Sequence, residues 1–130
     1  MLQPIRNNIT GDEGVRLRQA DITDEGNRYV LDYLTFPKLE EIEGISHLFT
    51  TRTGGVSEGI FSSLNLSFSR GDDPECVHSN FEHVAYAMGC SVENMVLSKQ
   101  THTTNIRLVT SEDCGKGIIK EQDYTDVDGL

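Results

Sequence analysis

The sequence TTRTGGVSEGIFSSLNLS occupies residues 50–67 and surrounds one cation, Arg52, with three glycines and seven hydroxyl side chains. Glycine and serine by themselves favour a flexible linker on the protein surface. The same stretch also contains apolar side chains that are too numerous to leave in water, namely Val56, Ile60, Phe61, Leu64 and Leu66. We therefore expect a loop that packs against the domain and holds its polar groups in fixed positions.

The overall composition is that of a globular domain. The chain has 130 residues, of which 36% are hydrophobic and 25% charged, and a chain of this size buries roughly 65 to 70% of its unfolded surface. The formal net charge is −10, with 21 acidic residues against 11 basic ones. Nucleic acid and anionic membranes are not expected as partners, because both require a positively charged face.

The compartment is expected to be the cytoplasm. No apolar run is long enough for a membrane span or a signal peptide. The three cysteines, Cys76, Cys90 and Cys114, are odd in number and widely spaced, which is typical of reduced thiols.

Hydrophobic patterns predict an α+β domain with a mixed β-sheet. Residues 1–28 mix glycine, asparagine and charge, and indicate a weakly structured N-terminal arm or a peripheral hairpin. Strands are predicted at residues 29–34, 45–51, 95–100 and 105–110.

One helix is predicted over residues 74–88. It begins after Asp73 with a proline in the first turn, and Gly89 provides the stop. Its apolar residues recur at helical spacing and should pack on the sheet, namely Val77, Phe81, Val84 and Met88.

Four histidines are candidates for chemistry. His47, His78 and His83 are expected to be packing or surface residues. His102 differs because it lies in KQTHTT between two predicted strands, where a rigid scaffold could hold its imidazole as a metal ligand or a base. One histidine does not complete a zinc site by itself.

Four motifs occur in order over residues 36–130: HLFTTRTGGVSEGIFSSLNLS, GDDPECVHSN, the triplet Gln100-Thr101-His102, and DVDGL. Their combination closely resembles the YfiH-like family, also called laccase-domain or multicopper polyphenol oxidase proteins and, more recently, purine nucleoside phosphorylases. Two positions depart from the family pattern, with Thr103 where glycine is usual and Phe81 where a basic residue is common. The resemblance implies that residues 29–130 form the N-terminal part of a YfiH-like domain, which would be incomplete.

The resemblance also implies a set of site residues. His102 would be the first zinc ligand, with a cysteine and a histidine expected beyond Leu130, and copper is less expected than zinc. Arg52 would be catalytic and bind substrate, because a guanidinium can pair with phosphate in a fork geometry. The other implied substrate-binding residues are Gly54, Gly55, Ser63, Asn65 and Gln100, the small ones letting a substrate approach the backbone.

The implied function is a zinc-dependent purine nucleoside phosphorylase with adenosine deaminase activity, acting on purine nucleosides and phosphate. One alternative is an inactive incomplete domain that serves as a binding or assembly half and self-associates through apolar surface exposed near Leu130. Another is a polyphenol oxidoreductase, as in the older laccase label. A multicopper oxidase, however, needs many histidines, commonly in H-x-H pairs, and the chain has four histidines and no such pair. A role in peptidoglycan editing is also attached to bacterial members of the family.

Overall fold

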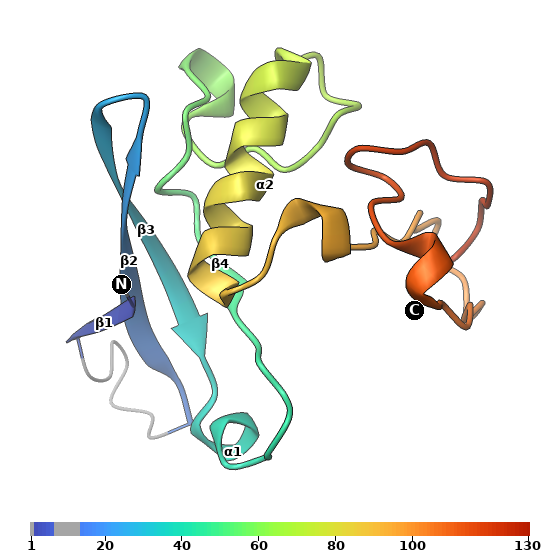
Figure 1. Cartoon of the computed structure of the whole chain (residues 1–130), viewed down its shortest axis with the longest axis horizontal. Coiled ribbons are helices and arrows are strands. Elements are labelled where there is room, and N and C mark those ends of the chain that lie inside the picture. The colour runs from blue at the N-terminus through green and yellow to red at the C-terminus, as the bar shows by residue number, and fades with distance from the viewer. Residues whose placement is uncertain (1, 7–13) are drawn as a thin grey trace. The chain divides into compact units, whose positions relative to one another are not determined.

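The structure is a computed structural model that describes residues 2–6 and 14–130, with side chains described from residue 14 onward. The chain divides into two compact units, Met1–Gly89 and Cys90–Leu130. Figure 1 shows that the first unit carries the β-sheet and the long helix, whereas the second is built mainly of loops.

The sheet of the first unit has the strand order β1-β2-β3-β4. The strands are β1 (Leu2–Arg6), β2 (Arg16–Asp24), β3 (Asn27–Thr35) and β4 (Phe49–Thr50), and each pairs antiparallel with its neighbour. Strands β2 and β3 form a hairpin around Glu25 and Gly26, whose φ angles are 46° and 82°. Two positive φ angles match the right-handed twist of the flanking strands, which explains the tight turn.

The helix α2 (Pro74–Met88) packs on β2 and β3. The Asp73 side chain caps its first turn by accepting the backbone N–H of Glu75 at 3.0 Å, and Gly89 ends it in the left-handed conformation at φ 73°. The inward face is apolar, with Val77 fully buried and Phe81 3% exposed. The helix predicted over 74–88 and its inward face are confirmed, except that Met88 is only half-buried.

The α+β class is confirmed, but the described sheet is antiparallel throughout instead of mixed. The prediction of a weakly structured arm over 1–28 is wrong for residues 16–24, which form β2 with Ala20 and Ile22 in the core. Charged residues on the other face of this strand concealed its apolar alternation. Strand β1 pairs antiparallel with β2, as in the hairpin alternative, but β2 belongs to the core and is not peripheral. Residues 7–13 lie outside the described residues.

Three predicted strands are absent or shorter. Of residues 45–51 only Phe49–Thr50 form a strand, β4, because only these two pair with β3. Residues 45–48, which come after the short helix α1 (Pro37–Glu40), are not part of the sheet. Residues 95–100 and 105–110 form no strand and make only isolated bridges, Lys99 with Val127 and Ile106 with Gly129. Apolar alternation predicts a strand only where a partner covers one face, and Ile106 and Leu108 are 81% and 89% exposed.

In the second unit, side-chain contacts add to the backbone hydrogen bonds and to a small buried group formed by Val92, Tyr124 and Val127. Asp113 accepts Lys116 at 2.7 Å and Arg107 at 3.3 Å, and the hydrogen bond from Lys116 is the largest of the effects that hold the pKa of Asp113 well below its usual value. Arg107 lies over the Tyr124 ring, 4.7 Å from its centroid. The remaining elements of the described residues are short 3-10 helices: η1 (Gly59–Phe61) lies in the first unit, and η2 (Val92–Asn94) and η3 (Ser111–Asp113) lie in the second.

Apolar residues near Leu130 are exposed, as expected: Leu130 is 44% exposed, and Ile106, which pairs with the preceding Gly129, is 81% exposed. Self-association through this surface remains a proposal. Among the described helices, none has the length and apolar character required to cross a membrane.

Candidate functional site

The loop at residues 50–67 is fixed to the sheet at its beginning. The Thr51 hydroxyl donates to the backbone carbonyl of Asp32 at 2.6 Å, and the Thr53 hydroxyl donates to the Asp32 carboxylate at 2.8 Å. Leu64 is buried, whereas Ile60 is 86% exposed. The expectation of a packed loop is therefore confirmed for most of its length, and η1 is the part that projects into solvent.

The two adjacent glycines of this loop are required by close packing. Gly54 has φ 96°, and a Cβ atom there would clash with the backbone of Leu31. A Cβ atom at Gly55 would clash with the carbonyl oxygen of Ser63 and the side chain of Asn80. The structure thus gives these buried glycines a packing role, because protein atoms occupy the space that a Cβ atom would need. Their contact with a substrate stays a prediction.

Asn80 in α2 is the central polar residue beneath the loop. Its Oδ1 accepts the backbone N–H of Val56 at 2.7 Å, while its Nδ2 donates to the Ser57 hydroxyl and to the Asn65 carbonyl, each at 2.8 Å. The side chain is 0% exposed and has partners on both ends of the amide, as a buried polar group requires.

Asp72 closes the same network from the loop before α2. Its carboxylate accepts the Ser57 hydroxyl at 2.6 Å and the Asn65 side-chain amide at 3.0 Å. The hydrogen bond from Ser57 is the largest cause that lowers the pKa of Asp72, followed by that from Asn65. Two segments separated in sequence are therefore tied together through Asp72 and Asn80.

His83 joins the loop to the tip of the β2–β3 hairpin. The imidazole is 3% exposed, with Nδ1 2.7 Å from the Gly54 carbonyl oxygen and Nε2 3.0 Å from an Asp24 carboxylate oxygen. Its ring also lies 4.9 Å from that of Tyr29. His83 is thus a packing residue, as expected from the sequence, and it helps to fix Gly54.

Arg52 is the cation that this scaffold presents. Its side chain is exposed, its Nε donates to the Ser62 carbonyl at 2.7 Å, and within residues 14–130 it forms no salt bridge. It lines a cavity of about 330 Å³ together with Ile60, Phe61, Ser62, Leu64 and Asn65. A guanidinium held at one nitrogen and paired with no carboxylate can bind an anion.

The second loop carries His102, in the unit Cys90–Leu130. His102 is exposed and lies at a bend of the backbone, where its φ angle is 62°. Asp128 accepts the backbone N–H of Thr101 at 3.1 Å and that of Thr103 at 2.9 Å. Asp126 accepts the Thr101 hydroxyl at 2.7 Å. The DVDGL segment therefore holds the turn that presents the imidazole.

The charge of Asp128 is stabilised by these contacts. Burial alone would raise its pKa, but the hydrogen bonds from the Thr101 backbone and from Thr103 outweigh burial, so that the pKa is lowered overall. Asp128 is ionised at neutral pH and accepts from both sides of His102.

As a metal ligand His102 fits in type and exposure, but the described residues do not complete a site. Residues 14–130 contain no group of three or more histidine, cysteine, aspartate or glutamate side chains placed to hold a metal ion. Tetrahedral zinc takes three or four protein ligands. The described residues accordingly offer one candidate zinc ligand.

The predicted site residues fall into two sets, one in each compact unit of the chain. Arg52 and Asn65 line one cavity, and the Ser63 hydroxyl accepts the Gly55 backbone N–H at 3.2 Å. Gln100 is exposed two residues before His102, in the second unit. Sequence reasoning missed the residues that hold these loops, namely Asp72, Asn80, His83, Asp126 and Asp128. A signal existed for Asn80, since it is a polar residue on the apolar face of the predicted helix.

The structure has an α+β fold in which Arg52 and His102 are exposed on loops that internal hydrogen bonds hold in place. Residues 46–130 match the family described as multi-copper polyphenol oxidoreductase laccase. The chain belongs to this family, which confirms the resemblance found in the sequence.

Named relatives are purine nucleoside phosphorylases. A purine nucleoside phosphorylase of Corynebacterium glutamicum is 37% identical over 65 residues, which are 50% of this chain and 26% of the relative. The purine nucleoside phosphorylase YlmD of Bacillus subtilis is 38% identical over 69 residues, which are 53% of this chain and 25% of the relative. The chain thus matches about a quarter of the length of these relatives.

A solved structure shows the same fold. The crystal structure of YlmD from Geobacillus stearothermophilus superposes with a TM-score of 0.61 at 32% identity, covering 83% of this chain and 38% of that protein.

Proposed function

We propose that the protein containing this chain is a purine nucleoside phosphorylase in which Arg52 binds phosphate. The observation that carries the proposal is the state of Arg52, an exposed guanidinium without a salt bridge to any described residue, on the rim of a 330 Å³ cavity. The names of the relatives support the same activity.

The chemistry assigned to Arg52 is positioning and charge stabilisation. In phosphorolysis a phosphate oxygen bonds to C1′ of the ribose while the bond from C1′ to the purine nitrogen breaks, giving ribose 1-phosphate and the free base. A guanidinium holds the phosphate against C1′ and lowers the cost of bringing its negative charge into the site. The Arg52 Nε bond to the Ser62 carbonyl orients the guanidinium for this task.

We further propose that His102 is one ligand of a zinc ion whose other ligands lie outside the described residues. When bound, zinc would supply an activated water, and such a water would be the nucleophile of the proposed adenosine deaminase activity. The contribution of this chain is the turn held by Asp126 and Asp128, which fixes the direction of the His102 side chain. The proposed compartment is the cytoplasm, supported by the free state of Cys76, Cys90 and Cys114.

The test is an assay of the intact protein with inosine and adenosine, each with and without phosphate. Phosphate-dependent release of hypoxanthine from inosine, with formation of ribose 1-phosphate, would support the proposal. Conversion of adenosine to inosine without phosphate would support the deaminase. Oxidation of a polyphenol without any reaction of nucleosides would overturn the proposal in favour of a laccase-like enzyme.

Metal analysis tests the role of His102 separately. His102→Ala should lower the zinc content of the purified protein and remove deamination with it, because one protein ligand is lost. His78→Ala is the matched control, since His78 is a half-buried histidine of α2 beside Glu82. Full zinc occupancy in His102→Ala would show that His102 is not a ligand.

A further inference from the structure

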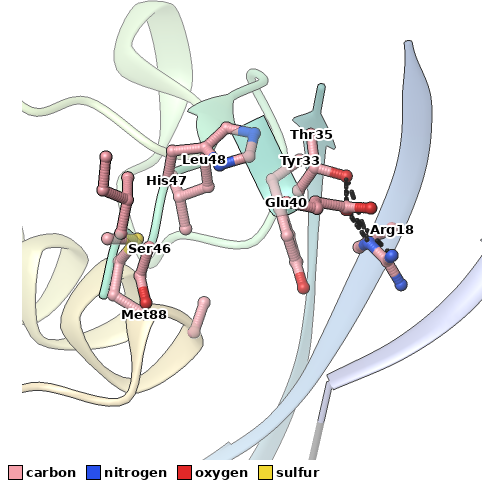
Figure 2. Close-up of a pocket in the computed structure, with 10 residues that line it drawn as sticks. Arg18, Tyr33, Thr35, Glu40, Ser46, His47, Leu48 and Met88 are labelled. Atoms are coloured by element: carbon pink, nitrogen blue, oxygen red, sulfur yellow. Dashed lines mark hydrogen bonds and ion pairs between the residues drawn. The ribbon is translucent and has the colours of Figure 1, made fainter. Parts of the chain in front are cut away.

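A second cavity, of about 390 Å³, lies in the first unit between the sheet, α1 and the end of α2 (Figure 2). This volume lies within the range of pockets that hold small molecules. Part of its lining is apolar, contributed by Ile45, Leu48, Ala87 and Met88. The remaining lining is polar and comprises Arg18, Tyr33, Thr35, Glu40, Ser46 and His47.

The charged groups of this cavity are already paired. The Arg18 guanidinium donates to the Glu40 carboxylate at 2.9 Å and to the Thr35 hydroxyl at 3.1 Å. Thr35 in turn donates to Glu40 at 2.6 Å, and Figure 2 shows the three side chains gathered at one side of the cavity. A ligand with a negative charge would find no unpaired cation here and would also lie close to Glu40.

The Tyr33 hydroxyl, in contrast, has no partner among the described residues. Tyr33 is 2% exposed, and Figure 2 shows its hydroxyl pointing away from the Thr35, Glu40 and Arg18 cluster. Burial, the largest cause, raises the pKa of Tyr33 above its ordinary value, so the hydroxyl keeps its proton and can donate. A buried hydroxyl without an acceptor reduces stability, and an acceptor brought by a ligand would remove this cost.

His47 provides a second donor in the lining. Its Nε2 accepts the backbone N–H of Phe36 at 2.8 Å, so that nitrogen carries no hydrogen. In the neutral ring the hydrogen is then on Nδ1, which acts as a donor. The ring stacks on Phe36 at a centroid distance of 5.8 Å, and this contact fixes its plane.

We propose that this cavity binds an uncharged aromatic or heteroaromatic molecule that carries a carbonyl oxygen or ring nitrogen as hydrogen-bond acceptor. The ring would pack against Leu48 and Met88, and the acceptor would take the Tyr33 hydroxyl. Met88 is unbranched and half-buried, which lets its side chain adapt to the ring. This site is separate from the cavity of Arg52 and independent of the proposed phosphorylase activity.

The test uses benzamide, which combines a ring with a neutral carbonyl acceptor, and the intact protein labelled with ¹³C at its methionine methyl groups. The Met88 signal, assigned through Met88→Leu, should shift and saturate at millimolar benzamide, a range suited to so small a ligand. Met95 is not part of the lining, and its signal serves as the internal reference for a non-specific shift. Absence of a saturable shift at Met88 would overturn the proposal.

Two comparisons test the chemistry of the site. Tyr33→Phe should weaken the benzamide Kd about three- to ten-fold, the effect of one neutral hydrogen bond. Tyr29→Phe, on the same strand but outside the lining, should leave it unchanged. An equal Kd in Tyr33→Phe would overturn the role of the hydroxyl. Benzoate has the same shape and a negative charge, and tighter binding of benzoate than of benzamide would overturn the uncharged class.

Discussion

Asn80 Oδ1 accepts the backbone N–H of Val56 at 2.7 Å, from a side chain that is 0% exposed. This bond joins the middle of α2 to the glycine-rich loop. Because the Asn80 amide also donates to Ser57 and Asn65, removing it would leave several buried groups without partners. The position of the loop that presents Arg52 thus depends on a residue of the helix beneath it.

Asn80→Ala should lower the free energy of unfolding by about 2–4 kcal/mol, because the Val56 N–H and its neighbours lose their partner. Urea unfolding monitored by circular dichroism measures the change. Asn94→Ala is the control and should change the free energy of unfolding by less than about 0.5 kcal/mol, since Asn94 is exposed and its side chain donates a long bond, 3.4 Å, to the Ser91 hydroxyl. An Asn80→Ala protein as stable as the wild type would contradict the assigned network.

Gly54→Ala and Gly59→Ala separate two costs of replacing a glycine. Both have positive φ, 96° and 60°, but Gly59 has open space where a Cβ atom would lie, whereas Gly54 faces Leu31. Gly59→Ala should cost about 1 kcal/mol of unfolding free energy through backbone strain alone. Gly54→Ala should cost about 3 kcal/mol or more, because a clash with β3 is added. Equal losses in urea unfolding would show that the loop does not pack on Leu31 as described.

The Asp72 network predicts an acid-sensitive part of the stability. The pKa of Asp72 is lowered in the folded state from its ordinary 3.8, first by Ser57 and then by Asn65. A lowered folded pKa contributes stability above the unfolded pKa, and this stability is lost as pH falls through the folded pKa. Stability should therefore decrease as pH is lowered below about 4, and Asp72→Asn should reduce this decrease. Glu121→Gln, at an exposed acid outside the network, should keep the wild-type profile. An unchanged pH profile in Asp72→Asn would contradict the role of the carboxylate.

Asp128→Ala should loosen the turn that presents His102. The backbone N–H groups of Thr101 and Thr103 both donate to the Asp128 carboxylate, so the exchange of these two amide hydrogens with deuterium should become faster. Glu121→Ala removes an exposed carboxylate elsewhere in the same unit and should leave both exchange rates unchanged. Equal rates in Asp128→Ala and the wild type would show that the turn does not depend on Asp128.

The sequence predicts best what is encoded locally. The prediction of the helix at 74–88 was correct, because the residues that begin and end it, the cap Asp73, Pro74 and Gly89, lie next to the helix or inside it in the sequence. The strand predicted over residues 105–110 was wrong, because no partner strand covers the apolar residues Ile106 and Leu108. Arg52 and His102 could be selected from motifs, whereas the contacts of Asn80 and Asp128 join segments 15 to 27 residues apart. Such pairings arise from the tertiary fold and have no local sequence signal.

The role of Arg52 is tested most directly by the phosphate dependence of inosine cleavage in Arg52→Ala. The proposed role predicts a KM for phosphate that rises at least ten-fold, because a charge-assisted hydrogen bond of about 1.5–3 kcal/mol is lost, while the zinc content stays that of the wild type. Arg70→Ala, at another exposed arginine of the same unit, controls for the loss of a positive charge. A KM for phosphate in Arg52→Ala equal to that of the wild type would contradict the assignment of Arg52 as the phosphate-binding residue.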